Sequence, residues 1–304
     1  MPDNEGGGLP CWSMANTCEI DVLKRLILMV MVLAGFACPA AARAKPDTVC
    51  PQPLRVHLDL HAPSAYYDPS GQLRGMDVEM VQAIMQAAGC QWRWHVTPMT
   101  GARIIKSLQD GDIDLMIRAS KTPDRDRFAW FSQPYRQEIV GLYARVRSDL
   151  PQTLTLADAL RLGLRLIGPA SGWYGIEFEQ YRNRFRQEKR YTAYPDAKIG
   201  TELLFATPSR GELVLIDADL FYHFVGPDRV MDIRQASPNL HITPAHLMAS
   251  QKTVGPATMA ALNKAIRRLQ QSGELQQLEL SYRPQLLRDQ LDGQAKLGAA
   301  HRIR

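Results

Sequence analysis

Two apolar segments of the chain are each followed by polar side chains that could hold a small charged molecule. Ser120 and Arg125 come after residues 113–117, whose apolar character is typical of a buried strand. Asp217 directly follows a second such segment, residues 213–216. An arginine binds a carboxylate through two parallel hydrogen bonds, a serine hydroxyl adds a donor, and an aspartate can pair with an ammonium group. The three side chains predict a clamp for an α-amino acid, with helix capping as the alternative role of Asp217.

Strands and helices must alternate around these side chains if they are to meet, because ligands of α/β sheets bind beside the carboxyl ends of strands. In the first half, the apolar pattern predicts strands at 54–58, 92–96 and 113–117, and helices from 76 to 88 and up to Gly111. In the second half it predicts strands at 138–146, 164–168, 190–194, 213–216 and 241–249, helices at 176–185 and 202–205, and a helical region over 259–275. This alternation predicts an α/β fold with two lobes.

The first 44 residues are predicted to be a leader with a secretory signal peptide at 24–44. Lys24 and Arg25 form its positive start, residues 26–37 are apolar, and Ala44 ends a small-x-small cleavage site. The apolar run is shorter than the roughly 20 residues that cross a bilayer as a helix, which argues against the alternative of a membrane anchor. We therefore expect cleavage after Ala44 and export of the remaining chain.

Removal of this leader leaves two of the five cysteines, Cys50 and Cys90. An even number of cysteines in an exported protein favours a disulfide, and two buried free thiols are the alternative. Each cysteine stands just before a predicted strand, and consecutive strands of such sheets usually lie side by side. A Cys50–Cys90 bridge would join the two strands at their amino ends.

Composition and motifs exclude several classes of protein. The chain has 45% hydrophobic and 22% charged residues, and its 36 basic and 31 acidic side chains give a net charge of +5, too small and scattered for a nucleic-acid-binding surface. Phosphate-binding loops, dinucleotide-binding turns and G-x-S-x-G nucleophile motifs are missing from the sequence, so we expect no cofactor. His241 and His246 have no metal-ligand pattern around them, so we expect no metal site.

Residues 111–125 and 131–135 resemble a known signature. The "GxxD" strand, the loop ending in arginine and the segment Phe131-Ser132-Gln133-Pro134-Tyr135 are similar to those of the bacterial extracellular solute-binding proteins of family 3, the polar amino-acid-binding type II periplasmic binding proteins. Residues 71–78 and 262–282 resemble the family's first helix lead-in and closing helices. The resemblance implies two hinged lobes with a ligand cleft between them: lobe 1 at 45–145 plus 244–284, lobe 2 at 146–243, and a polar tail at 285–304.

The resemblance also implies roles for the three polar side chains and for others. Arg125 and Ser120 would bind a ligand carboxylate, and Asp217 an ammonium group. Asp59 would contact the ligand side chain, or else satisfy nearby backbone groups. The remaining positions are a turn donating backbone N–H groups, at Gly172 and Trp173, and a ligand-stacking aromatic at Tyr66.

Arg118 departs from this pattern, because a small residue is usual seven positions before the binding arginine. It adds a second cation to the predicted cleft. Arg118 therefore either binds a second carboxylate of the ligand or pairs internally with Asp59. Trp173 is a second departure, since a small hydroxyl residue is usual there.

We expect a monomeric periplasmic protein that captures a small carboxylated solute, an amino acid, for an ABC permease or a membrane sensor. One alternative is an enzyme resembling periplasmic cyclohexadienyl dehydratases, with Glu202 or Glu177 as the general acid. The simpler role for both glutamates is a solvated helix face. A third possibility is a sensory or accessory domain with a degenerate cleft.

Overall fold

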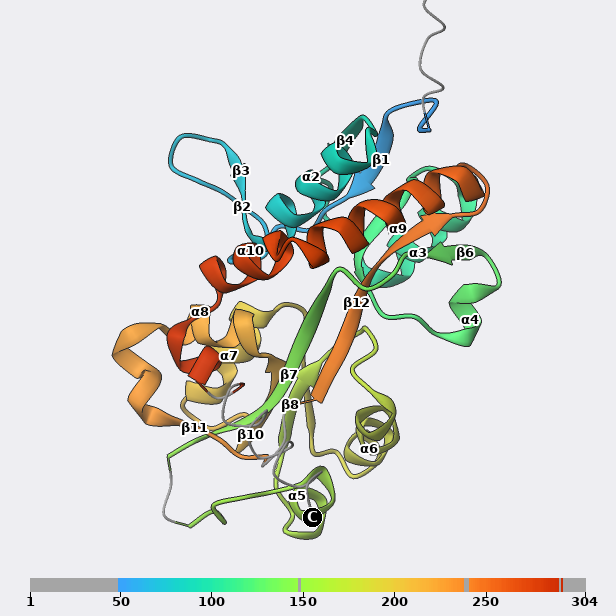
Figure 1. Ribbon diagram of the computed structural model, residues 1–304. Helices are drawn as coiled ribbons and strands as arrows, with labels where there is room; N and C mark the ends of the chain where they lie inside the picture. Colours follow the sequence, from blue (N-terminus) through green and yellow to red (C-terminus); the bar gives the residue numbers. More distant parts are fainter. Residues whose placement is uncertain (1–48, 147–148, 238–240, 290, 292–304) are drawn as a thin grey trace, which may run out of the picture. The chain divides into compact units, whose positions relative to one another are not determined.

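The computed structural model describes residues 49–146, 149–237, 241–289 and 291 (Figure 1). The predicted leader and signal peptide therefore lie outside the described residues. Among the residues that are described, no helix has the length and apolar character that crossing a membrane requires.

The sheet of lobe 1 has the strand order β4-β1-β5-β12, in which β12 is antiparallel to β5 and the other neighbours are parallel. Its strands are β1 (Leu54–His57), β4 (Trp92–His95), β5 (Leu115–Ala119) and β12 (His241–Ser250), with β6 (Ala129–Phe131) paired to β12. The other elements are α2 (Met76–Ala88), α3 (Gly101–Asp110), α4 (Pro123–Asp126), α9 (Pro256–Gln271), α10 (Glu274–Tyr282) and the hairpin of β2 (Tyr66–Tyr67) and β3 (Leu73–Arg74).

Helices cover both faces of this sheet because its strands are apolar on both sides. Leu247 and Ala249 of β12 pack into a cluster with α2, α9 and α10, and these three helices lie together in Figure 1. Met248, which points to the opposite face, packs instead against α3. Strand β5 begins two residues later than predicted and runs to Ala119, so that it delivers Ser120 at its carboxyl end.

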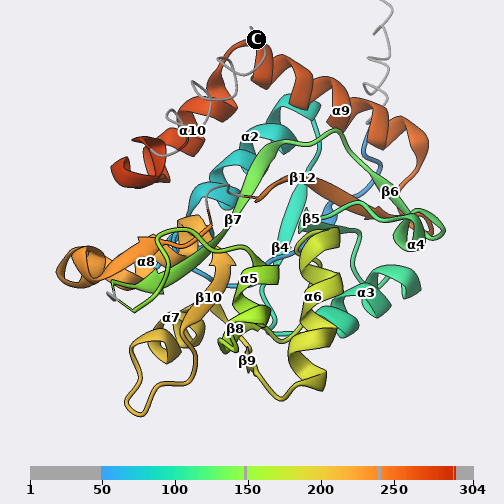
Figure 2. The same ribbon diagram turned by 90° about the horizontal axis from the view of Figure 1, so that it is seen from below.

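The sheet of lobe 2 has the order β7-β10-β8-β9, with β7 antiparallel to β10. Its strands are β7 (Arg136–Arg145), β8 (Leu166–Pro169), β9 (Tyr191–Tyr194) and β10 (Leu213–Asp217), with β11 (Ile233–Gln235) paired to β7. Its helices are α5 (Leu156–Arg161), α6 (Ile176–Gln187), α7 (Ala197–Phe205), α8 (Ala218–Arg229) and the 3-10 turn η1 (Val230–Asp232). Val214 and Ile216 face α7 and α8, whereas Leu213 and Leu215 face α5 and α6, on opposite sides of the sheet in Figure 2.

Strands β7 and β12 connect the two lobes. Residues 136–140 of β7 pair with residues 241–245 of β12. Beyond this pairing β7 continues against β10 of lobe 2, and β12 continues against β5 of lobe 1. The two antiparallel strands therefore form the connection about which lobes of this kind hinge.

A further segment also reaches lobe 2, at the position where the sequence predicts a polar tail. Residues 285–289 are helical, and Leu287 is fully buried in the apolar cluster of α7 and α8. Arg283, just before them, donates to Asp219 of α8 at 3.0 Å. Only Leu287 and Leu291 of the described residues in this segment pack against the cluster, too few positions to show apolar periodicity in the sequence.

The predicted disulfide is present. Cys50 and Cys90 are bonded, with their Cα atoms 5.2 Å apart. They precede β1 and β4, which are parallel neighbours with Leu54 opposite Trp92. The bridge therefore joins the amino ends of these strands, away from the carboxyl ends at which ligands of such sheets bind.

Candidate functional site

Arg125 is a half-buried cation in the short helix α4, which follows β5 and begins at Pro123. Its Nη1 donates to the backbone carbonyl of Ser120 at 2.8 Å. Burial lowers its pKa, and no carboxylate of the described residues forms an ion pair with it. The Ser120 hydroxyl likewise makes no hydrogen bond to a described residue, although Ser120 is buried. Both groups can therefore donate to an added anion.

Asp217 ends strand β10 and is buried. Its Oδ1 accepts from the backbone N–H of Leu220 at 3.0 Å, so the residue caps helix α8, as one of its two sequence interpretations held. Burial, reinforced by Glu138 and Asp219 and opposed by Arg118, raises the pKa of Asp217 to about 7.

Arg118 reaches from lobe 1 to this aspartate. Its Nη2 lies 2.6 Å from Oε1 of Glu138 and 3.3 Å from Oδ2 of Asp217, and its Nε lies 3.9 Å from Oδ2 of Asp77. Burial opposes its charge, but the three carboxylates outweigh burial and raise the pKa of Arg118. The pairing of Arg118 with Asp59, one of the two predicted possibilities, is therefore wrong. Its actual partners come from β7, β10 and α2, not from the loop after β1.

Asp59 is half-buried and lies beside a histidine: its Oδ1 is 3.2 Å from Nε2 of His57. Tyr66 is half-buried in β2 and pairs with Arg74 of β3. Within the described part of the chain, neither residue forms a hydrogen bond or ion pair with Arg125 or Asp217. Their roles in binding stay predictions.

The turn at Gly172 and Trp173 brings a different aromatic residue, Tyr174, against its glycine. Gly172 has a φ of 97° and its carbonyl accepts from Arg182, while Trp173 is half-buried. A Cβ on Gly172 would lie 2.8 Å from the ring of Tyr174, so glycine allows that close approach. Burial, which the charges of Glu138 and Asp217 reinforce and that of Arg118 opposes, raises the pKa of Tyr174.

Three residues of this cluster were missed in the sequence. Asp77 is fully buried and accepts from Nε of Arg136 at 2.7 Å and from the hydroxyl of Tyr135 at 2.6 Å. Arg136 outweighs burial and lowers the pKa of Asp77. Arg136 is itself buried, and Glu138 is half-buried two residues along β7. The available signal was a charged residue at the start of a predicted element. Asp77 lies in the first turn of α2, and Arg136 is the first residue of β7.

The two glutamates considered as general acids lie elsewhere. Glu202 is exposed on α7, and its ion pair with Arg229 at 2.8 Å lowers its pKa. Glu177 is exposed in the first turn of α6. Both therefore occupy the solvated helix faces that were their simpler interpretation.

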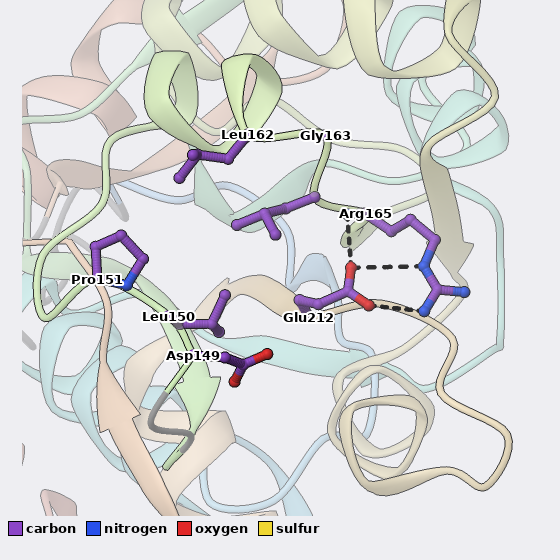
Figure 3. Close-up of a pocket in the computed structure, with 8 residues that line it drawn as sticks. Asp149, Leu150, Pro151, Leu162, Gly163, Arg165 and Glu212 are labelled. Atoms are coloured by element: carbon purple, nitrogen blue, oxygen red, sulfur yellow. Dashed lines mark hydrogen bonds and ion pairs between the residues drawn. The ribbon is translucent and has the colours of Figure 1, made fainter.

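A surface pocket of about 510 Å³ lies at the end of the lobe 2 sheet that is opposite to Asp217 (Figure 3). Arg165 and Glu212, paired at 2.7 Å, stand beside it together with several leucines. These residues precede β8 and β10, whereas Asp217 ends β10. The pocket is therefore separate from the group of polar side chains described above.

The sequence pattern of the bacterial extracellular solute-binding proteins, family 3, matches residues 54–285. This chain belongs to that family. The matched range includes every predicted ligand-binding residue, from Asp59 to Asp217. No curated relative matches the chain in sequence.

Solved structures support the same fold. A histidine kinase sensor domain with similarity to periplasmic binding proteins has a TM-score of 0.62 at 17% identity, covering 77% of this chain and 98% of its own. The arginine-, lysine-, histidine-binding protein ArtJ of Geobacillus stearothermophilus has a TM-score of 0.61 at 18% identity, covering 78% and 99%. The ancestral amino acid-binding protein AncCDT-1, a precursor of cyclohexadienyl dehydratase, has a TM-score of 0.60 at 17% identity, covering 76% and 95%. The family 3 protein studied here thus has the two-lobed α/β fold of type II periplasmic binding proteins.

Proposed function

We propose that this solute-binding protein captures a small carboxylated solute in the periplasm, and that Arg125 is the group that holds the carboxylate. The observation that carries the proposal is the state of Arg125: a half-buried guanidinium without a carboxylate partner among the described residues. A partly desolvated cation gains most from an added anion, because the anion replaces lost hydration and neutralises the charge.

The proposed mechanism is closure of the lobes on the solute. Lobe 1 supplies Arg125 and the Ser120 hydroxyl, and lobe 2 would add backbone N–H groups of the turn at Gly172 and Trp173. A solute that contacts both lobes favours the state in which both contacts form at once. The partner that reads this state would be an ABC permease or a membrane sensor. A structural neighbour of each kind, an amino-acid-binding protein and a sensor domain, supports these two possibilities.

Thermal unfolding of the purified protein with a panel of amino acids, hydroxy acids, dicarboxylates and prephenate tests the proposal. A ligand present at 100 times its Kd stabilises the fold by about 2.7 kcal/mol, a shift of a few degrees for a chain of this size. We expect the shift to vanish in Arg125→Ala. The matched control is Arg127→Ala. Arg127 lies two positions after Arg125, and its side chain is 76% exposed and pairs with Asp124.

Persistence of the shift in Arg125→Ala would remove Arg125 from the site. No shift with any compound would favour the alternative of a sensory or accessory domain with a degenerate cleft.

An enzyme remains a second candidate because of Asp217. Burial raises the pKa of this carboxyl, which is the direction that a general acid at neutral pH requires. In this version Asp217 takes the role that the sequence gave to Glu202 or Glu177. Turnover of prephenate that is lost in Asp217→Asn would establish it, and absence of turnover would exclude this substrate.

A further inference from the structure

We propose that Arg118 occupies the place that an ammonium group of the ligand would take, so that the captured solute is a carboxylate without an amine. This inference rests on the proposed capture of a carboxylate by Arg125. It concerns the other half of an amino-acid clamp, the acidic side chain that would receive the ammonium group.

Both carboxylate oxygens of Asp217 are already engaged. Oδ1 accepts from the N–H of Leu220 at 3.0 Å, and Oδ2 lies 3.3 Å from Nη2 of Arg118. The same Nη2 lies 2.6 Å from Glu138. A guanidinium of the protein thus neutralises the carboxylate that the sequence assigned to a ligand ammonium.

The carboxylate of Asp77, which also lies close to Arg118, already has partners of its own. Asp77 is fully buried and receives two hydrogen bonds from Arg136, at 2.7 and 3.0 Å, and one from Tyr135. Its distance from Nε of Arg118 is 3.9 Å, too long for a hydrogen bond. Asp217 and Asp77 are therefore not left for an incoming cation, and Glu138 already has Oε1 engaged by Arg118.

The backbone of Arg118 is consistent with a side chain held by its partners. Its φ is 56°, in the left-handed region that residues with a Cβ rarely adopt. Such a conformation persists where surrounding contacts over-determine it. Here the carboxylates on β7 and β10 supply those contacts, and they draw the guanidinium from lobe 1 to lobe 2.

The charges of the site follow from this arrangement. An ammonium group would have to displace Arg118 from Asp217 and leave a largely buried guanidinium with a weaker set of partners. An anion meets no such obstacle: Arg125 has no carboxylate partner, and Nη1 of Arg118 makes no hydrogen bond to a described residue. The site therefore favours mono- or dicarboxylates such as hydroxy acids over the corresponding amino acids.

Matched ligand pairs that differ only in the amine test the proposal on the full protein. Titration calorimetry would compare lactate with alanine, and 2-hydroxyglutarate with glutamate. We expect the amine-free member of the bound pair to have a Kd at least about tenfold lower, equivalent to about 1.4 kcal/mol. In Arg118→Gly, which suits the left-handed backbone and frees the carboxylates of Glu138 and Asp217, the preference should reverse.

The control variant is Lys189→Gly. Lys189 has the same φ of 56° but is exposed in the turn after α6, so its replacement tests the glycine effect alone and should leave both affinities unchanged. If Arg118→Gly fails to fold, the ligand pairs decide the question on the unmodified protein.

An amino acid that binds as tightly as its hydroxy counterpart overturns the inference and leaves carboxylate capture intact. If no carboxylate of these pairs or of the thermal-unfolding panel binds the protein or Arg118→Gly, carboxylate capture itself is wrong, and the inference falls with it.

Discussion

Arg118 and Arg125 lie seven residues apart, at the end of β5 and in the helix that follows it, yet their surroundings differ completely. The Arg118 guanidinium lies within 3.3 Å of two carboxylates, that of Glu138 on β7 and that of Asp217 on β10. The Arg125 guanidinium forms no ion pair with a described residue and donates one hydrogen bond, to the backbone carbonyl of Ser120. Removing one partner of a buried ion pair destabilises a fold because it leaves the other charge uncompensated, whereas a buried charge that has no partner is available for a ligand. Both are arginines, so residue type alone does not separate these roles.

The largest effect is expected at the most completely paired arginine, Arg136. Replacing it in Arg136→Met leaves Asp77 buried without its cation, which costs about 3 to 5 kcal/mol of the free energy of unfolding. Urea unfolding measures the loss. A change below about 1 kcal/mol would mean that Asp77 gains another partner, and the distinction between paired and unpaired arginines would lose its basis.

Asp217, a carboxylate partner of Arg118, should make the stability of the fold depend on pH. Its pKa of about 7 in the folded state lies above the value of about 4 in an unfolded chain. The folded state therefore binds the proton more tightly, and the stability from this group is full below pH 4 and is lost as pH rises through 7. Between pH 5 and 7 the loss amounts to about 2 kcal/mol.

Asp217→Asn should remove this component and retain the helix cap. The measurement is the difference in unfolding free energy between the protein and the variant at each pH, which cancels the contributions of titrating groups far from Asp217. A difference that does not change with pH would contradict the raised pKa.

Arg118→Met should cost less than Arg136→Met, about 1 to 2 kcal/mol of the free energy of unfolding. The reason is that the Arg118 side chain is 21% exposed, so water can take over part of the solvation of Glu138 and Asp217. Comparison of the two urea midpoints tests the order. A larger loss for Arg118→Met would show that the contact between the lobes contributes more than the fully buried pair.

Arg125→Met should change the unfolding free energy by no more than about 0.5 kcal/mol, or raise it, because no described carboxylate loses a partner. The same variant should abolish ligand-induced stabilisation. Loss of ligand binding at unchanged stability would complete the contrast with Arg136. A large loss of stability would instead make Arg125 a structural residue.

Local patterns in the sequence were sufficient for most of the fold. Helices α2 and α3 end at Gly89 and Gly111, both in the left-handed conformation, as their apolar periodicity and glycines predicted. The disulfide followed from the position of Cys50 and Cys90 before neighbouring strands. These features depend on residues close in sequence, or on the general pairing of consecutive strands.

Contacts between distant residues were not predictable in the same way. Asp217, one of the partners of Arg118, is 99 positions away from it, and no property of either residue identifies the pair. The burial of Leu287 depends on a surface formed by α7 and α8, which only the folded lobe provides.

The short helical segment around Leu287 places the two ends of the described chain in different lobes. Gln52 precedes β1 of lobe 1, and Asp289 follows the buried leucine in lobe 2, and both side chains are exposed. A pair of fluorescent dyes attached at these two positions would therefore report the separation of the lobes directly. Energy transfer between them would follow solute capture in real time, without any label near the cleft.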